Sequence, residues 1–203
     1  MHYFSDACER NKKNILQELK NNISNRASIF EIGSGTGQHA LYFCNEMPFW
    51  IWQTSDLKEN HSNINERISE SLNSNILLPI EFDVNKDYQV LSNKYDLIFT
   101  ANTFHIMSWN AVCNCIKKAS ELLKDAGKFI IYGPFLFPDK ITKKSNILFD
   151  DFLKNQNKEM GLRHFYEITR KLKQVDLIFE KNIEMPSNNN LLIYIKNKST
   201  NLL

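Results

Sequence analysis

Short apolar runs and amphipathic stretches alternate along most of the chain. The runs are rich in β-branched and aromatic residues and are bounded by polar or glycine-containing segments, which is typical of buried strands. The run at 95–102 is almost continuously apolar, as expected for a strand covered on both faces. We therefore predict five strands, at 28–33, 49–56, 77–84, 95–102 and 127–135.

Segments with helical periodicity separate these runs. Residues 5–22 place an apolar stripe on one helix face, and Ser5 is in position to cap the first turn. Ser108 likewise precedes an apolar stripe that predicts a helix from Trp109 onward. Strands that alternate with helices in this way predict a parallel sheet with helices on both of its faces. The remaining predicted helices lie at 38–45 and 57–72.

The pattern changes after the fifth strand. A polar, loop-rich stretch with one helical segment precedes a predicted helix at 164–174. Two further strands, at 175–184 and 190–196, are separated only by the turn-rich sequence MPSNNN. So short a connection makes this strand pair antiparallel, because a parallel crossover needs a dozen or more residues. The α/β sheet is therefore predicted to have seven strands, five parallel plus a C-terminal hairpin whose last strand is antiparallel.

We expect one domain over residues 1–203, because no repeat, linker or composition shift divides the chain. Within it, residues 1–25 form a leading helix, and 136–174 form an insertion and helix on the substrate side.

A glycine-rich loop, FEIGSGTGQHA, follows the first predicted strand. It lacks the Gly-Lys-Ser/Thr ending of a Walker phosphate loop. It also departs from the G-x-G-x-x-G spacing of dinucleotide-binding loops, and Glu31 would be unfavourable beside phosphates. S-adenosylmethionine has no phosphate and carries an ammonium and a sulfonium, so a carboxylate there is favourable. A loop that merely reverses the chain remains the alternative.

Acid or amide side chains follow four successive predicted strands, at Glu31, Asp56, Asp83 and Asn102. The carboxyl ends of parallel strands meet at one edge of a sheet, where ligands bind in open α/β folds. Asp56 has the position that accepts hydrogen bonds from ribose hydroxyls, a feature that fits both NAD and S-adenosylmethionine. Asp83 is placed to accept from an adenine amino group while Val84 packs on the ring, although a helix-capping role for Asp83 stays open.

Composition and charge narrow the function classes. The chain is 42% hydrophobic and 24% charged, which is ordinary for a globular protein. Lysine and arginine number 25 against 23 aspartate and glutamate residues, which argues against a broad nucleic-acid footprint. No apolar run reaches the roughly 20 residues of a membrane helix, and the polar N-terminus predicts a cytoplasmic protein with no membrane contact. The cysteine and histidine spacings predict no metal site.

Taken together, the motifs resemble a known family. They are similar to the class I S-adenosylmethionine-dependent methyltransferase-like family catalogued as domain of unknown function 938, in order along nearly the whole chain. The similar segments are SDACERNKKNIL, EIGSGTGQHALYF, WQTSD, ANTFHIMSW, YGPF, SNILFDDFLKNQNKEMGLRHFYEI and MPSNNNLLIY. The chain departs from the usual pattern at Asp125-Ala126, where such enzymes carry Pro-Gly, and at His164, where the family often has an acid.

The resemblance implies a Rossmann-like class I methyltransferase fold and S-adenosylmethionine as cofactor, and it supplies no substrate. Glu31 then faces the methionine ammonium, directly or through water, Asp56 faces the ribose, and Asp83 with Val84 faces the adenine. The implied cofactor-binding residues are Glu31, Gly33, Gly35, Gly37, Asp56, Asp83, Val84 and Asn102.

Methyl transfer needs an in-line nucleophile, exclusion of water and, for a hydroxyl or thiol acceptor, a general base. His105, three residues beyond the fourth strand, is the best candidate for that base, with a purely structural histidine as the alternative. Tyr132 ends the fifth strand and is predicted to hydrogen-bond the substrate.

On the substrate side we expect Arg10, Asn11 and Asn146. Arg10 suits a carboxylate or phosphate, although a surface salt bridge is equally consistent. A basic cluster at Lys140, Lys143 and Lys144 also slightly favours an anionic substrate. The motif NPPY, which marks methylation of amino nitrogens in DNA or protein glutamine, is replaced by ANTF, and this favours a small molecule.

The predicted function is therefore S-adenosylmethionine-dependent methyl transfer to a small molecule. Two rivals stay open: a non-catalytic binding or regulatory protein with a methyltransferase fold, and an NAD-dependent oxidoreductase. The oligomeric state is not fixed by the sequence.

Overall fold

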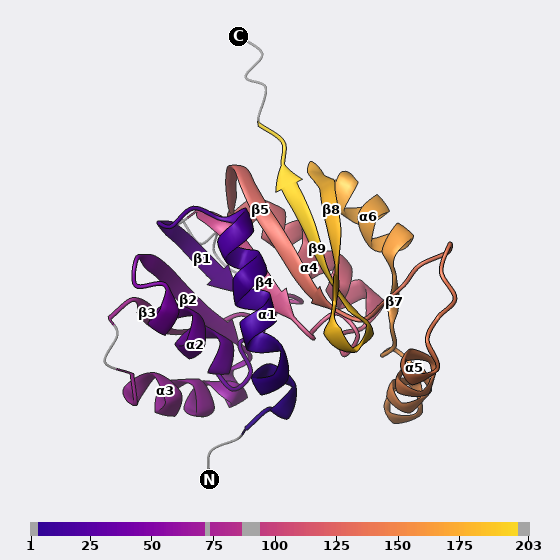
Figure 1. Ribbon diagram of the computed structural model, residues 1–203, viewed down its shortest axis with the longest axis horizontal. Coiled ribbons are helices and arrows are strands. Elements are labelled where there is room, and N and C mark those ends of the chain that lie inside the picture. Colours follow the sequence, from indigo (N-terminus) through magenta and orange to yellow (C-terminus); the bar gives the residue numbers. More distant parts are fainter. Residues whose placement is uncertain (1–3, 72–73, 87–93, 199–203) are drawn as a thin grey trace.

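A seven-stranded sheet forms the centre of the molecule, seen in a computed structural model that describes residues 4–71, 74–86 and 94–198 (Figure 1). The strand order is β3-β2-β1-β4-β5-β9-β8. The strands are β1 (Ala27–Glu31), β2 (Trp50–Asp56), β3 (Ile76–Glu81), β4 (Tyr95–Ala101), β5 (Leu123–Gly133), β8 (Leu177–Met185) and β9 (Asn189–Lys196).

The strand directions confirm the predicted outline. β1 to β5 are all parallel to one another, whereas β9 runs antiparallel to both β5 and β8. The chain order reverses between β1 and β4, because β2 and β3 lie on one side of β1 and the later strands lie on the other. Such a switch point leaves a crevice at the carboxyl ends of the strands.

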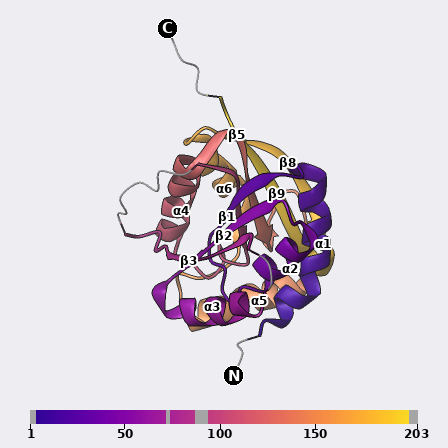
Figure 2. The ribbon, with the colours of Figure 1, turned by 90° about the vertical axis from the view of Figure 1, so that its left-hand side faces the viewer.

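Helices cover both faces of the sheet, as the alternating pattern predicts. α1 and α2 pack on one face around Ile29, and α4 and α6 pack on the other around Phe30. Figure 2 shows these two layers end-on, with α4 on one side and α1 and α2 on the other. The helices are α1 (Asp6–Asn22), α2 (Gln38–Glu46), α3 (His61–Ser69), α4 (Trp109–Leu122), α5 (Lys144–Gln156) and α6 (Phe165–Lys173), with 3₁₀ turns η1 (Lys58–Asn60) and η2 (Pro186–Asn188).

Both predicted N-caps are present. The Ser5 hydroxyl accepts from Cys8 N at the start of α1, and the Ser108 hydroxyl accepts from Ala111 N at the start of α4. Each cap satisfies a backbone N–H that the first helical turn would otherwise leave without a partner.

Some boundaries differ from those predicted. β5 begins at Leu123 rather than at 127, because Leu123 pairs with Tyr95 across a register shift that the apolar pattern does not reveal. The helix predicted at 57–72 starts as η1 before continuing as α3, and residue 72 lies outside the described residues. A short parallel pair, β6 (Phe135–Leu136) with β7 (Arg163–His164), was not predicted.

Candidate active site

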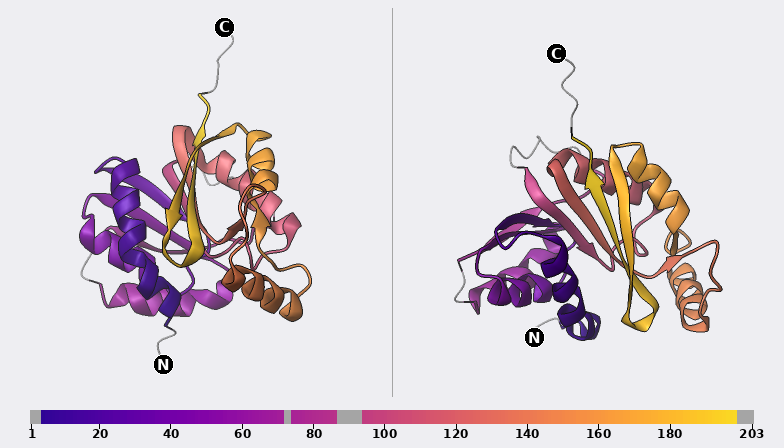
Figure 3. Two further views of the ribbon diagram at one scale, coloured as in Figure 1. Left: turned by 45° about the vertical axis from the view of Figure 1, so that its right-hand side comes forward. Right: turned by 45° about the horizontal axis from the view of Figure 1, so that its top comes forward.

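A cavity of about 890 Å³ opens at the carboxyl edge of the sheet. Its lining comes from the ends of β1, β2, β4 and β5, and from three segments distant in sequence: α1, the β8–β9 turn and the start of α5. Figure 3 shows α1, this turn and α5 at the same edge of the sheet. The volume lies within the range of small-molecule sites.

The glycine loop forms part of the cavity wall. Gly33, Gly35 and Gly37 have φ angles of 74°, 56° and 71°, in the left-handed region that favours glycine. Gly33 and Gly35 line the cavity, whereas Gly37 lies behind them at the N-terminus of α2. A side chain at Gly33 would place its Cβ 2.7 Å from Thr103 Cγ2, while at Gly35 there is open space. The loop is therefore held close to β4 and presents bare backbone at Gly35.

Gly33→Ala is expected to destabilise the protein by about 2–4 kcal/mol, because the new methyl group meets Thr103 in addition to adopting an unfavourable φ. Gly35→Ala is the matched control. Its new methyl group meets no neighbour, so only the unfavourable φ should lower the free energy of unfolding, by about 1–2 kcal/mol. Denaturant unfolding of both variants measures the difference. Equal losses would show that the contact between Gly33 and Thr103 does not constrain the loop.

Asp56 ties the loop to the end of β2. Its carboxylate accepts from Gly35 N at 2.6 Å through Oδ2, and from Leu57 N and Asn60 Nδ2 at 2.7 Å each through Oδ1. A carboxylate offers about four acceptor positions, so three are filled within the protein. The side chain lines the cavity, and one position remains for a ligand hydroxyl.

Three more predicted residues line the cavity at strand ends. Asp83 and Val84 follow β3, where the Asp83 carboxylate accepts from Asn85 N. Asn102 follows β4 with a φ of 59°, and its backbone N–H donates to Tyr132 O. Asn102 is thus held between β4 and β5, facing the middle of the cavity edge.

Glu31 lies behind the cavity wall. It is absent from the cavity lining and is almost fully buried on the α2 side of the sheet. Its Oε2 accepts from Trp52 Nε1 at 3.0 Å, and its Oε1 lies 4.0 Å from His39 Nδ1. Burial raises the pKa of Glu31 to about 7. Glu31 thus lies beneath the loop, and its predicted interaction with a ligand ammonium, directly or through water, stays a prediction.

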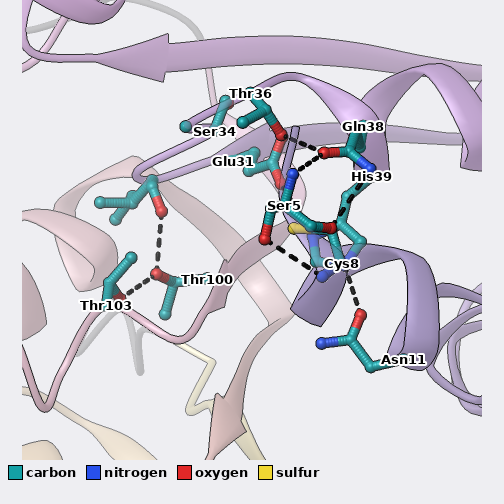
Figure 4. A network of polar contacts seen from close by, with 12 residues as sticks. Ser5, Cys8, Asn11, Glu31, Ser34, Thr36, Gln38, His39, Thr100 and Thr103 are labelled. Atoms are coloured by element: carbon teal, nitrogen blue, oxygen red, sulfur yellow. Dashed lines mark hydrogen bonds and ion pairs between the residues drawn. The ribbon is translucent and has the colours of Figure 1, made fainter. Parts of the chain in front are cut away.

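A buried polar chain links Glu31 to the leading helix through His39 (Figure 4). His39 Nε2 hydrogen-bonds Asn11 Oδ1 at 2.7 Å, and both residues line the cavity while remaining buried. Burial lowers the pKa of His39 to about 4, so the ring is neutral at pH 7. Nearer the start of α1, Gln38 Oε1 accepts from Ser5 N at 2.6 Å and from Thr36 Oγ1 at 2.9 Å. Helix α1 is therefore fastened to α2 and to the glycine loop at two points.

His105 faces the cavity from the segment after β4. The ring is buried and lies edge-on to Phe149 of α5, with centroids 5.2 Å apart. Burial, with a smaller contribution from the Arg163 charge, lowers the pKa of His105 to about 4. The imidazole is therefore neutral at pH 7 but is a weak base. Its predicted role as general base stays a prediction.

Tyr132 lies across the cavity edge at the end of β5. It is 4% exposed, lines the cavity and lies against the side chains of Asn11 and Asn189, with the Arg10 charge nearby. Burial raises the pKa of the phenol. The predicted residues Arg10, Asn11 and Tyr132 are thus brought together from α1 and β5.

Asn146 also lines the cavity, at the start of α5. It donates to Asn188 O, and Asn188 Nδ2 donates to Ser145 Oγ, which fastens α5 to the β8–β9 turn. The predicted lysine cluster lies outside this cavity, and Lys140 forms an ion pair with Glu184.

Several lining residues were missed by sequence reasoning, among them Cys8, Phe149 and Asn189. Cys8 and Phe149 lie in amphipathic helices, where the pattern marks a face but not what that face covers. Asn189 lies in a turn, and only the reversed direction of β9 brings that turn to the ligand edge.

Metal-ligand clusters and membrane-spanning helices are both absent from the described ranges. No group of three or more His, Cys, Asp or Glu side chains there is arranged to hold a metal ion. No helix in those ranges is both long and apolar enough to cross a bilayer.

Comparison with known proteins shows which family the chain belongs to. Residues 2–196 match the family described as protein of unknown function (DUF938). The chain belongs to this family. Within the DUF938 chain, the match extends from the leading helix to the last strand and so includes every element around the cavity.

Solved structures share the fold of this DUF938 protein. An O-methyltransferase family protein from Burkholderia thailandensis superposes with a TM-score of 0.80 at 16% identity, over 96% of this chain and 58% of that one. Human N-acetylserotonin methyltransferase, solved with S-adenosylmethionine, superposes with a TM-score of 0.80 at 16% identity, over 95% of this chain and 53% of that one. An O-methyltransferase family 2 protein from Planctomyces limnophilus, solved with apigenin, has a TM-score of 0.77 at 15% identity, over 94% of this chain and 60% of that one.

These similarities establish a Rossmann-like methyltransferase fold for the DUF938 chain. The chain spans little more than half the length of these solved proteins.

Proposed function

We propose that the protein binds S-adenosylmethionine and transfers its methyl group to a small-molecule acceptor. The observation that carries this proposal is the left-handed glycine loop, held by Asp56 and open to the cavity at Gly35. Among the described lining residues the only lysine or arginine is Arg10 on α1. Arg67 donates to Thr36 O from outside this lining, so a phosphate-bearing dinucleotide would find no cation on the cavity side of the loop, whereas a positively charged, phosphate-free nucleoside needs none.

The residues at the strand ends suit the parts of this cofactor. Asp56 has an acceptor position left for a ribose hydroxyl, and Asp83 with Val84 offers a hydrogen-bond acceptor beside an apolar surface for adenine. Gly33, Gly35 and Asn102 are proposed to hold the amino-acid part. When bound, the cofactor supplies a methyl group on a positively charged sulfur, which is already a good leaving group.

The acceptor is proposed to bind between α1, β5 and α5. His105 and Tyr132 face this part of the cavity and are the proposed catalytic residues, because both would contact a bound acceptor. Arg10, Asn11 and Asn146 are the proposed substrate-binding residues, and the Arg10 charge favours an anionic acceptor. A cavity of this size favours a small molecule over a macromolecule.

Cofactor choice is tested by calorimetry with S-adenosylhomocysteine and with NAD. We expect S-adenosylhomocysteine to bind and NAD not to bind. NAD binding alone would replace the proposal with an oxidoreductase. Transfer is tested by incubating the protein with methyl-labelled S-adenosylmethionine and a cell extract limited to small molecules, and binding without transfer would leave a non-catalytic protein.

His105→Ala is expected to slow methyl transfer to that extract about tenfold, the effect of losing one hydrogen bond of about 1.4 kcal/mol to the acceptor. Loss of a strong general base would cost 10²–10⁴-fold instead. Affinity for S-adenosylhomocysteine should stay within about twofold of wild type. His164→Ala, at an exposed position outside the cavity, is the matched control.

A further inference from the structure

The acceptor end of the cavity is rich in hydrogen-bond donors. Asn11 Oδ1 is taken by His39 Nε2 at 2.7 Å, so the Asn11 amide nitrogen is the end left to face Tyr132. The Tyr132 hydroxyl and the Arg10 guanidinium lie at the same end of the cavity. We call Arg10, Asn11 and Tyr132 the donor cluster. Asn11 and Tyr132 are more than nine-tenths buried and form a fixed part of the cavity wall, whereas Arg10 is exposed at its rim.

No carboxylate lines the described cavity wall beside these donors, and Glu31, which lies behind that wall, is separated from Asn11 by His39. Among the described lining residues, the only carboxylates are Asp56 and Asp83, which follow β2 and β3. Tyr132 ends β5, three strand spacings from β2, or about 14 Å at the usual interstrand distance. An ammonium group on an acceptor would therefore meet one positive charge and no negative charge at this end, whereas an anion would meet a cation and neutral donors.

Among the described lining residues at the acceptor end, no titratable group readily takes up a proton at neutral pH. His105 is a weak base because burial and Arg163 lower its pKa to about 4. Burial raises the pKa of the Tyr132 phenol and of the Cys8 thiol, so neither ionises readily. A hydroxyl acceptor would release a proton that none of these groups holds well. An acceptor atom that is already anionic releases none.

We infer that, given the proposed function, the acceptor is a carboxylic acid, and that its carboxylate, held by the donor cluster, is itself methylated to a methyl ester. A carboxylate oxygen forms the new bond to the methyl carbon as the carbon–sulfur bond breaks. The electron pair of that bond remains on sulfur, which becomes a neutral thioether. One negative and one positive charge are consumed, and no proton moves. The planar guanidinium of Arg10 can hold a carboxylate through two parallel N–H···O hydrogen bonds.

The first test measures binding and needs no turnover. The protein is saturated with S-adenosylhomocysteine, and calorimetry compares acetate, phenylacetate and decanoate with their primary amides. At least one carboxylate should bind ten times more tightly than its amide. Arg10→Gln should abolish that preference, and Arg170→Gln, an exposed arginine outside the cavity, should preserve it. A panel in which no carboxylate is preferred would overturn the inference.

The second test identifies the bond formed. After transfer of labelled methyl groups to the small-molecule extract, mild alkali hydrolyses methyl esters and releases volatile labelled methanol, whereas ethers and methylamines are stable. We expect the label to become volatile, and Tyr132→Phe to reduce it at least fivefold. Alkali-stable label would refute ester formation and leave the proposed function intact.

The remaining outcomes separate the two proposals. Binding of S-adenosylhomocysteine without transfer would refute both ester formation and catalysis. Absence of S-adenosylhomocysteine binding would refute the proposed function itself.

Discussion

Asp56→Ala is expected to weaken binding of S-adenosylhomocysteine at least about 100-fold. The carboxylate is proposed to accept from the ribose, and hydrogen bonds to charged groups contribute about 1.5–3 kcal/mol each. The variant also releases the Gly35 and Leu57 N–H groups that Asp56 now holds, so the loop loses its preorganised shape. Calorimetry on the purified variant gives the dissociation constant directly.

The matched control is Asp96→Ala. Asp96 lies at the opposite end of the sheet, where it accepts from Ser28 and pairs with Lys124. This substitution also removes a carboxylate with backbone and side-chain partners, but far from the cavity, so affinity should be unchanged. An Asp56 variant that bound as tightly as this control would disprove the ribose assignment.

Glu31→Gln is expected to raise the free energy of unfolding, relative to wild type, by about 3 kcal/mol between pH 4.5 and pH 7. Burial raises the pKa of Glu31 from 4.5 to about 7 in the folded state. Between these values the folded protein holds a proton that the unfolded chain has lost, so wild-type stability falls as pH rises. Glutamine does not titrate, and the free energy of unfolding of the variant relative to wild type should therefore rise from pH 4.5 to pH 7.

His39→Gln supplies a control of opposite sign. Burial lowers the pKa of His39 from 6.5 to about 4, so the unfolded chain binds more protons between these values and wild-type stability rises with pH. The stability of this variant relative to wild type should fall over that interval, again by about 3 kcal/mol. Denaturant unfolding at a series of pH values measures both differences. A flat difference curve for Glu31→Gln would mean that Glu31 is ionised in the folded protein.

The sheet and much of the candidate cavity could be predicted from sequence because one geometric rule covers them. Carboxyl ends of parallel strands share an edge, so polar residues that follow apolar runs meet there. Asp56, Asp83 and Asn102 do line one cavity. The short connection before 190–196 likewise sufficed to predict the antiparallel last strand.

Glu31 shows where that rule is too coarse. Side chains of a strand alternate between faces, and Ile29 packs with α1 and α2 while Phe30 packs on the opposite side. Glu31, two residues beyond Ile29, therefore points into the helix-covered face rather than over the edge. The alternation was readable in the sequence, but it decides the matter only once the covering helix is known.

Contacts between distant segments lay beyond sequence reasoning. The hydrogen bond of Asn11 with His39 joins residues 28 apart, and that of Asn146 with Asn188 joins residues 42 apart. Each depends on how a helix lies against the sheet, which periodicity within one segment does not encode. The placing of Arg10 and Tyr132 on one cavity wall has the same origin, since α1 and β5 meet only in the folded molecule.

The cavity draws its wall from Ser5 at one end of the described chain and from Asn189 near the other. A ribosome that has released only the first five strands will have exposed the glycine loop and Asp56 without the hairpin that completes the enclosure. The nascent protein should therefore gain its binding site only once β8 and β9 have been synthesised, after most of the core of this domain can already form.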